Sequence, residues 1–131
     1  MKKSGVLNPD ILWVLGSLGH TDMLVISDAG LPIPEFVTRI DLALTKNIPR
    51  FLDVLRVILD EMKVEKAIVA KEMKEKSPHM YEEVKKLLGN IPMEEVTHEE
   101  FKEMVRNAKC VIRTGEFTPY ANIILVAGVV F

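Results

Sequence analysis

The strongest constraint on the fold is an alternation of short apolar segments with amphipathic segments of about ten to fifteen residues. Strand-like segments at Met23–Ser27, Lys66–Ala70 and Lys109–Arg113 are separated by segments with helical periodicity. Such an alternation is typical of βαβ units, in which helices pack on the faces of a sheet. It predicts an α/β fold with a mainly parallel sheet flanked by helices.

The ends of the helices are indicated by local signals. Asn8 and Pro9 provide a cap and a first-turn proline for a helix that we expect to stop at Gly19. Ser77 and Pro78 repeat this start, and Thr97–Glu100 reads as a capping box. Two further helices are expected, at Arg50–Met62 and in the charged, solvated run Lys71–Lys76. The other expected strands are Arg39–Leu44, the weakly indicated Met93–Val96, and Asn122–Phe131. The last strand is apolar on both faces, which predicts an interior strand or one covered by a partner subunit.

Length and composition narrow the class of protein. The 131 residues fit one domain spanning residues 1–131, with 48% hydrophobic and 27% charged residues. A net charge of −2 without a basic face argues against nucleic-acid binding. The apolar run Ile123–Phe131 is too short to span a membrane as a helix, and the N-terminal segment does not resemble a signal peptide. A lone cysteine, Cys110, in an apolar pattern predicts an inert buried thiol and a cytoplasmic protein.

Several kinds of catalytic site lack support. The chain has no GxGxxG or GxxxxGK loop for a nucleotide, and no serine or cysteine lies in a nucleophile motif. The three histidines, His20, His79 and His98, lack the close spacing of a zinc site. We therefore expect neither a metal nor a cofactor, and we expect His79 to face solvent on its charged helix.

The segment Gly19–Pro34 carries titratable groups at both ends of an apolar strand. His20 follows a predicted helix end, where the helix dipole favours the protonated imidazole. Asp28 follows the strand, and ligands in open α/β sheets gather at the carboxyl ends of strands. His20 could equally be structural, and Asp28 could simply cap a turn. Asp22 is interpreted as local structure.

A second polar group lies in the last third of the chain. His98 begins a helix, where the dipole favours a neutral imidazole, and Lys102 lies four residues on, on the same face. Tyr120 and Asn122 have strand spacing, so their side chains should point the same way. These residues suit recognition and proton transfer on a small polyhydroxylated molecule. A surface His–Lys pair and a hydrogen-bonded turn remain the alternatives.

Five motifs, in order along the chain, resemble one known family. They are LGHTD (Leu18–Asp22), DAGLPIP (Asp28–Pro34), RIDLAL (Arg39–Leu44), THEEFK (Thr97–Lys102) and RTGEFTPYANIILVAGVVF (Arg113–Phe131). This set is similar to the D-ribose pyranase family, which shares a superfamily of sugar-ring isomerases with the L-fucose mutarotases. The resemblance covers nearly the whole chain, although Lys71–Val96 carries no matching motif.

The resemblance implies a function and an assembly. It implies a cytoplasmic, cofactor-free isomerase that interconverts the β-pyranose and β-furanose forms of D-ribose and so supplies ribokinase. His20 matches the acid–base histidine and Lys102 a position near the ligand; the positions that hold the sugar are matched by Asp28, His98, Tyr120 and Asn122. It also implies a ring-shaped homo-oligomer, a decamer of stacked rings, with active sites between subunits.

Other functions compatible with the residues are considered with this one. One is a mutarotase acting on fucose or another monosaccharide, since sugar specificity often depends on one or two hydroxyl contacts. Another is a non-catalytic sugar-binding accessory of a ribose transporter, and the last is an oligomeric scaffold. Asp28 also keeps two possible roles, orienting His20 or accepting a sugar hydroxyl.

Overall fold

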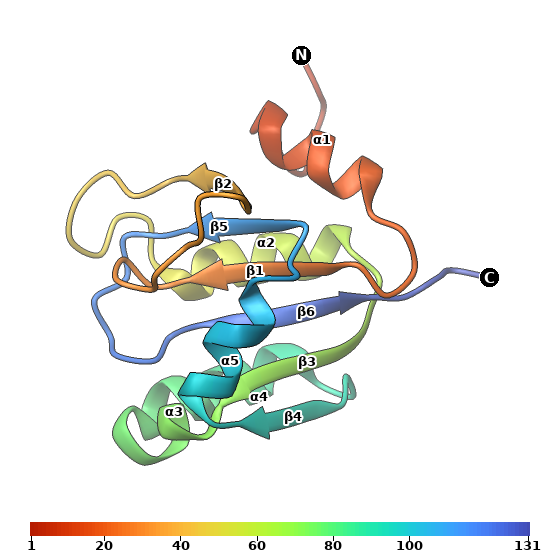
Figure 1. Ribbon diagram of the computed structural model, residues 1–131. Helices are drawn as coiled ribbons and strands as arrows, with labels where there is room; N and C mark the ends of the chain where they lie inside the picture. Colours follow the sequence, from red (N-terminus) through yellow and green to blue (C-terminus); the bar gives the residue numbers. More distant parts are fainter.

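A six-stranded sheet in the order β2-β5-β1-β6-β3-β4 forms the centre of the computed structural model, which describes residues 1–131 (Figure 1). The strands are β1 (Met23–Ser27), β2 (Thr38–Asp41), β3 (Val64–Ala70), β4 (Met93–Val96), β5 (Cys110–Arg113) and β6 (Ile123–Ala127). The β6 strand is antiparallel to both of its neighbours, β1 and β3, whereas the other three pairings are parallel. The α/β class is confirmed, and the sheet is mixed because β6 alone runs against the other strands.

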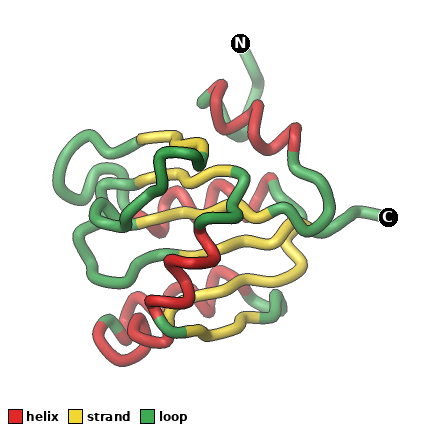
Figure 2. Tube along the Cα trace, viewed as in Figure 1, coloured by secondary structure: helices red, strands yellow, loops and turns green.

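Five helices flank this sheet, and Figure 2 shows them on both of its faces. They are α1 (Pro9–Ser17), α2 (Phe51–Glu61), α3 (Lys71–Lys76), α4 (Pro78–Leu88) and α5 (His98–Val105). The predicted caps are confirmed at α1, where Asn8 Oδ1 accepts from the Ile11 amide at 3.0 Å, and at α5, where Thr97 Oγ1 accepts from the Glu100 amide at 3.1 Å. None of the helices combines the length and the apolarity needed to cross a membrane.

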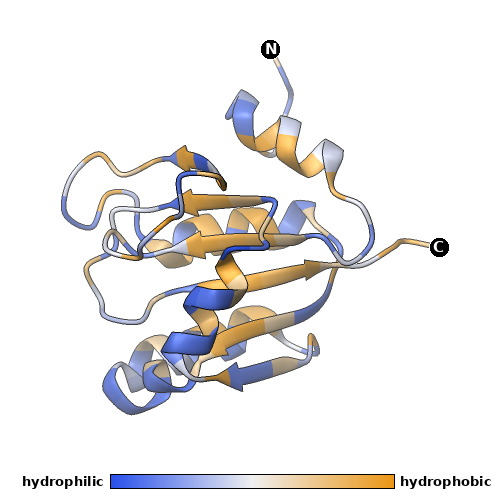
Figure 3. Ribbon diagram, viewed as in Figure 1, coloured by the Kyte–Doolittle hydropathy of each residue, from blue (hydrophilic) through white to orange (hydrophobic).

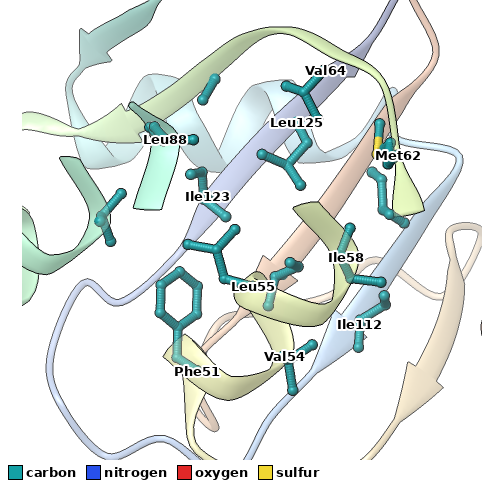
Figure 4. Close-up of a cluster of buried hydrophobic side chains, with 14 of the residues drawn as sticks. Phe51, Val54, Leu55, Ile58, Met62, Val64, Leu88, Ile112, Ile123 and Leu125 are labelled. Atoms are coloured by element: carbon teal, nitrogen blue, oxygen red, sulfur yellow. The ribbon is translucent and has the colours of Figure 1, made fainter. Parts of the chain in front are cut away.

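The strands in the middle of the sheet are buried on both faces, and Figure 3 shows that they consist mainly of hydrophobic residues. On one face, α2 packs Phe51, Leu55 and Ile58 against β5 and β6, as Figure 4 shows. On the other face, α5 contributes Phe101 and Val105 to a smaller core. Full burial of each such side chain stabilises the fold by roughly 1.5–3 kcal/mol. The prediction of an interior final strand is thereby confirmed.

Several predicted boundaries differ from the structure for local reasons. The β2 strand ends at Asp41, whose carboxylate accepts from the Ala43 amide at 3.0 Å and turns the chain. The β6 strand ends at Ala127, and Val130 and Phe131 are exposed. Apolar character alone does not show where strand pairing stops.

Three other expectations concern the individual residues Ser77, Cys110 and His79. Ser77 precedes α4 as predicted, but its hydroxyl donates to the Pro119 carbonyl at 2.7 Å and does not cap the helix. This contact ties the start of α4 to the loop before β6. Cys110 is fully buried, and burial raises the pKa of its thiol to about 11, as expected for an inert cysteine. His79 is exposed, as predicted.

Candidate active site

Asp28 lies directly after β1 and is fixed by a network of hydrogen bonds. Its Oδ1 accepts from the amides of Gly30 at 3.0 Å and Leu31 at 2.8 Å. Asn122 completes the network, because its Oδ1 accepts from the Asp28 amide at 2.8 Å and its Nδ2 donates to Asp28 Oδ2 at 3.3 Å. Burial raises the pKa of Asp28, against the opposing effect of the amide hydrogen bonds. Asp28 therefore caps a turn and also presents an oriented carboxylate.

His98 lies across from this carboxylate at the start of α5. Its backbone amide donates to both carboxylate oxygens of Glu72 at 3.0 Å, and its ring meets the Tyr120 ring edge-on with 5.0 Å between centroids. The Nδ1 atom of His98 is buried and has no hydrogen-bond partner in the protein. A buried polar atom without a partner is uncommon in folded proteins and suits a ligand contact.

These groups line one small cavity of about 250 Å³. Its lining residues are Asp28, Gly30, Leu31, Pro32, His98, Pro119, Tyr120 and Asn122. Tyr120 and Asn122 share it for a different reason from the one predicted, because both precede β6. Tyr120 has a φ of 62°, and the Asn122 amide donates to the Tyr120 carbonyl at 2.9 Å. A tight turn, and not strand alternation, brings the two side chains to the same cavity.

The loop that carries Tyr120 is anchored by a buried carboxylate, Glu116. It accepts from Arg50 Nη2 at 2.8 Å, from the Phe51 amide at 3.0 Å and from Thr118 Oγ1 at 2.7 Å. Burial alone would raise the pKa of Glu116, but these hydrogen bonds outweigh it and lower the pKa to about 2. The cavity wall is thereby tied to the start of α2.

Lys102 lies outside this cavity. Its Nζ is 2.8 Å from Glu99 Oε1, and it lines a wider groove of about 970 Å³ between α5 and residues 32–36. The groove and the cavity share Pro32 as a wall. Lys102 is therefore next to the site without facing the same space as His98.

His20 lies at the opposite end of β1 from Asp28. It pairs with Glu65, whose Oε2 is 2.9 Å from His20 Nε2, and both side chains are about half exposed. Since β1 is five residues long, it alone separates the two ends by about 17 Å. Asp28 therefore cannot orient His20 within one chain, so the first of its two possible roles is wrong for the single subunit.

Asp22 has the structural role that its position suggested. Its Oδ2 accepts from the Gly19 amide at 2.8 Å and lies 3.5 Å from Lys109 Nζ. The Gly19 hydrogen bond, with the nearby Lys109, lowers the pKa of Asp22. Gly19 thus belongs to a turn stabilised by Asp22, and α1 itself ends at Ser17.

Three glutamates of this arrangement were not predicted from the sequence. Glu65 and Glu72 lie in segments rich in charge, where a solvated side chain is the ordinary interpretation. Glu116 lies inside the matched segment Arg113–Phe131, and that context was the one available signal. No group of three or more His, Cys, Asp or Glu side chains is placed to hold a metal ion.

Comparison with known proteins identifies the family. A model of the RbsD / FucU transport protein family matches residues 1–130. The chain belongs to this family. Among curated members, the D-ribose pyranase of Coprothermobacter proteolyticus is 61% identical over 131 residues, the full length of both chains. The resemblance to D-ribose pyranases is thereby confirmed.

Solved structures of the RbsD / FucU family show the same fold. Bacillus subtilis RbsD complexed with D-ribose is 50% identical, with a TM-score of 0.97 and complete coverage of both chains. The fucose mutarotase of Streptococcus pneumoniae in complex with L-fucose is 26% identical, with a TM-score of 0.82 and 95% coverage of each chain. The family thus includes an RbsD and a fucose mutarotase whose structures each contain a sugar.

Proposed function

We propose that this protein is a D-ribose pyranase that converts β-D-ribopyranose to β-D-ribofuranose, the ring form used by ribokinase. The observation that carries the proposal is the full-length match, at a TM-score of 0.97, to a family member complexed with D-ribose. The polar cavity beside Asp28 supports it, because it offers carboxylate, imidazole and phenol groups to a small polyhydroxylated ligand.

The reaction consists of proton transfers around a ring opening. The anomeric hydroxyl loses a proton while the ring oxygen gains one, and the bond between C1 and the ring oxygen breaks to give an aldehyde. After rotation of the chain, the C4 hydroxyl attacks C1, and the proton transfers run in reverse. General acid–base catalysis of such steps is typically worth about 10²–10⁴-fold, and histidine suits it near neutral pH.

In this proposal, His20 is the residue that donates a proton to the ring oxygen. Asp28 accepts a sugar hydroxyl, since it retains acceptor capacity beyond its three hydrogen bonds within the protein. His98 contacts the sugar through its unpartnered Nδ1, and Tyr120 closes the cavity beside it. Asn122 holds a sugar hydroxyl together with Asp28, and Lys102 does so from the adjoining groove.

This assignment requires more than one subunit. His20 and the Asp28 cavity lie at opposite ends of β1, so a complete site needs His20 of one subunit at the cavity of another. We propose a ring-shaped homo-oligomer, a decamer of stacked rings, in the cytoplasm. Large apolar side chains on the surface, including Trp13, Phe36 and Phe117, are consistent with such contacts.

One NMR experiment compares this function with its alternatives. The purified protein is mixed with D-ribose and separately with L-fucose, and exchange between ring forms or anomers is measured by saturation transfer. We expect accelerated pyranose–furanose exchange with ribose. Acceleration confined to fucose would indicate a mutarotase, and ribose binding without acceleration would indicate a transporter accessory; either result would contradict the proposal.

A further inference from the structure

The His20–Glu65 pair joins two residues that are far apart in sequence. Glu65 Oε2 lies 2.9 Å from His20 Nε2, across 45 positions of the chain. Both side chains are about half exposed, and exposed ion pairs of this kind contribute little to folding stability. The pair therefore calls for an explanation other than stability.

The backbone of β3 directs Glu65 toward His20 through an irregularity. In the antiparallel pairing of β3 with β6, the register shifts between Val64 and Lys66, so Glu65 lies in a β-bulge. Bulges re-aim side chains and are over-represented next to active sites. Opposite the bulge, Gly128 leaves the room that Glu65 occupies, because a Cβ on Gly128 would lie 3.2 Å from the Glu65 Cβ.

The backbone around His20 is fixed by an unusual conformation at Thr21 and by hydrogen bonds to the end of β6. Thr21 adopts the left-handed region with a φ of 73°, which is uncommon for a residue other than glycine and occurs where the surroundings enforce it. Its amide donates to the Ala127 carbonyl at 2.8 Å, and the Ala127 amide donates to the Asp22 carbonyl at 2.8 Å. The end of β6 thus positions both His20 and, through Gly128, its partner Glu65.

We propose that Glu65 is a positioning residue for His20, which holds the imidazole with its proton on Nε2 and leaves Nδ1 to exchange protons with the sugar. This inference rests on the proposed function, because it assigns a role within the same reaction. A carboxylate that accepts from one ring nitrogen fixes the tautomer and orientation of the ring, and it stabilises the imidazolium that forms when the other nitrogen takes a proton.

The other charged side chains on the segments around His20 make different contacts. Asp22, on the same turn, binds the Gly19 amide and lies beside Lys109, which also donates to the Ser17 carbonyl at 3.1 Å. Lys63, before β3, also lies close to Gly128, because a Cβ on Gly128 would come within 3.3 Å of the Lys63 Cγ. Glu65 is the carboxylate in direct contact with the ring.

The test compares Glu65→Ala and Glu65→Gln with Glu94→Gln. Glu94 is a matched control, because it lies on the adjacent strand and forms a similar exposed pair with Lys66, 3.2 Å away. We expect Glu65→Ala to slow catalysed ribose exchange by about ten- to a hundredfold, a part of the usual acid–base contribution. Glu65→Gln should be intermediate, since an amide oxygen can still accept from Nε2–H. Ribose affinity should stay within about twofold of the unsubstituted protein in both, because neither change alters the cavity.

A spectroscopic readout separates this role from a general effect on structure. ¹⁵N NMR of the His20 ring under alkaline conditions should show the Nε2–H tautomer in the unsubstituted protein and a mixture of tautomers in Glu65→Ala. Wild-type exchange rates in Glu65→Ala, an unchanged tautomer, or an equal loss of rate in Glu94→Gln would overturn the inference. If the unsubstituted protein does not accelerate ribose exchange, the proposed function fails, and the tautomer comparison still decides whether Glu65 controls His20.

Discussion

His20 and Asp28 lie at opposite ends of β1, one beside Glu65 and the other in the polar cavity. They are eight positions apart in the sequence, yet the strand between them keeps His20, the proposed acid–base residue, away from the proposed sugar site of its own chain. This relationship makes an active site shared between subunits a requirement of the proposed mechanism.

Mixing two inactive variants tests the shared site. His20→Ala removes the proposed acid–base group from the shared site. Asp28→Asn removes the carboxylate charge from the cavity, while the amide oxygen of the new side chain can still accept from the amides of Gly30 and Leu31. Each variant alone should be nearly inactive. After subunits exchange in an equal mixture, about one quarter of sites should combine two intact halves, because each site draws on two subunits. As a control, mixing His20→Ala with the double variant should restore nothing. No recovery in the first mixture would contradict a shared site.

Replacing Asn122 should weaken ribose binding and also the fold. Asn122 is buried, and its side chain makes two hydrogen bonds to Asp28, so Asn122→Ala leaves the Asp28 amide without a partner. We expect a loss of about 1–3 kcal/mol in unfolding free energy and a comparable loss in ribose affinity. Urea unfolding and calorimetric titration measure the two effects. Unchanged affinity would count against Asn122 as part of the site.

The binding of ribose should depend on pH through Asp28. Burial raises the pKa of this carboxyl, so it takes up a proton at a higher pH than an ordinary aspartate. If the carboxylate accepts a sugar hydroxyl, affinity should be full above the raised pKa and should fall as pH decreases through it. Titration of the protein with ribose at several pH values measures this, with Asp28→Asn as the comparison. A pH dependence that persists in Asp28→Asn would assign it to another group.

The stability of the fold should decrease in acid because of Glu116. Its pKa in the folded protein is about 2, below the ordinary value of about 4.3 for an unfolded glutamate. The stabilisation is therefore fully present above the unfolded pKa and is lost as pH falls toward the folded one. At neutral pH, Glu116→Gln should cost roughly 2–4 kcal/mol. Denaturant unfolding of both proteins at several pH values should give stability curves that approach each other below about pH 4 and meet near pH 2; parallel curves would contradict the assignment.

Local signals in the sequence predicted much of the fold. The bounds Met23–Ser27 of β1 agree with the structure, and the caps at Asn8 and Thr97 form as expected, because both depend on residues close in sequence. The extent of Asn122–Phe131 was overestimated, because the end of pairing is set by neighbouring strands.

The sequence predicted a set of polar residues, and the fold brings four of them together in a way that the sequence did not predict. Asp28, His98, Tyr120 and Asn122 do converge on one cavity. The separation of His20 from them follows from strand geometry. The position of Glu65 follows from a bulge between β3 and β6, which pair across some sixty residues. A register shift of this kind leaves no mark in the sequence of either strand.

The most direct test of the proposed function is the exchange of D-ribose between its β-pyranose and β-furanose forms, measured by saturation-transfer NMR with equal amounts of unsubstituted protein and His20→Ala. The unsubstituted protein should accelerate the exchange well above the rate in buffer. His20→Ala should bind ribose with nearly unchanged affinity and leave the exchange at the buffer rate. Acceleration by His20→Ala equal to that of the unsubstituted protein would contradict the assignment of His20, and no acceleration by either would contradict the proposed function itself.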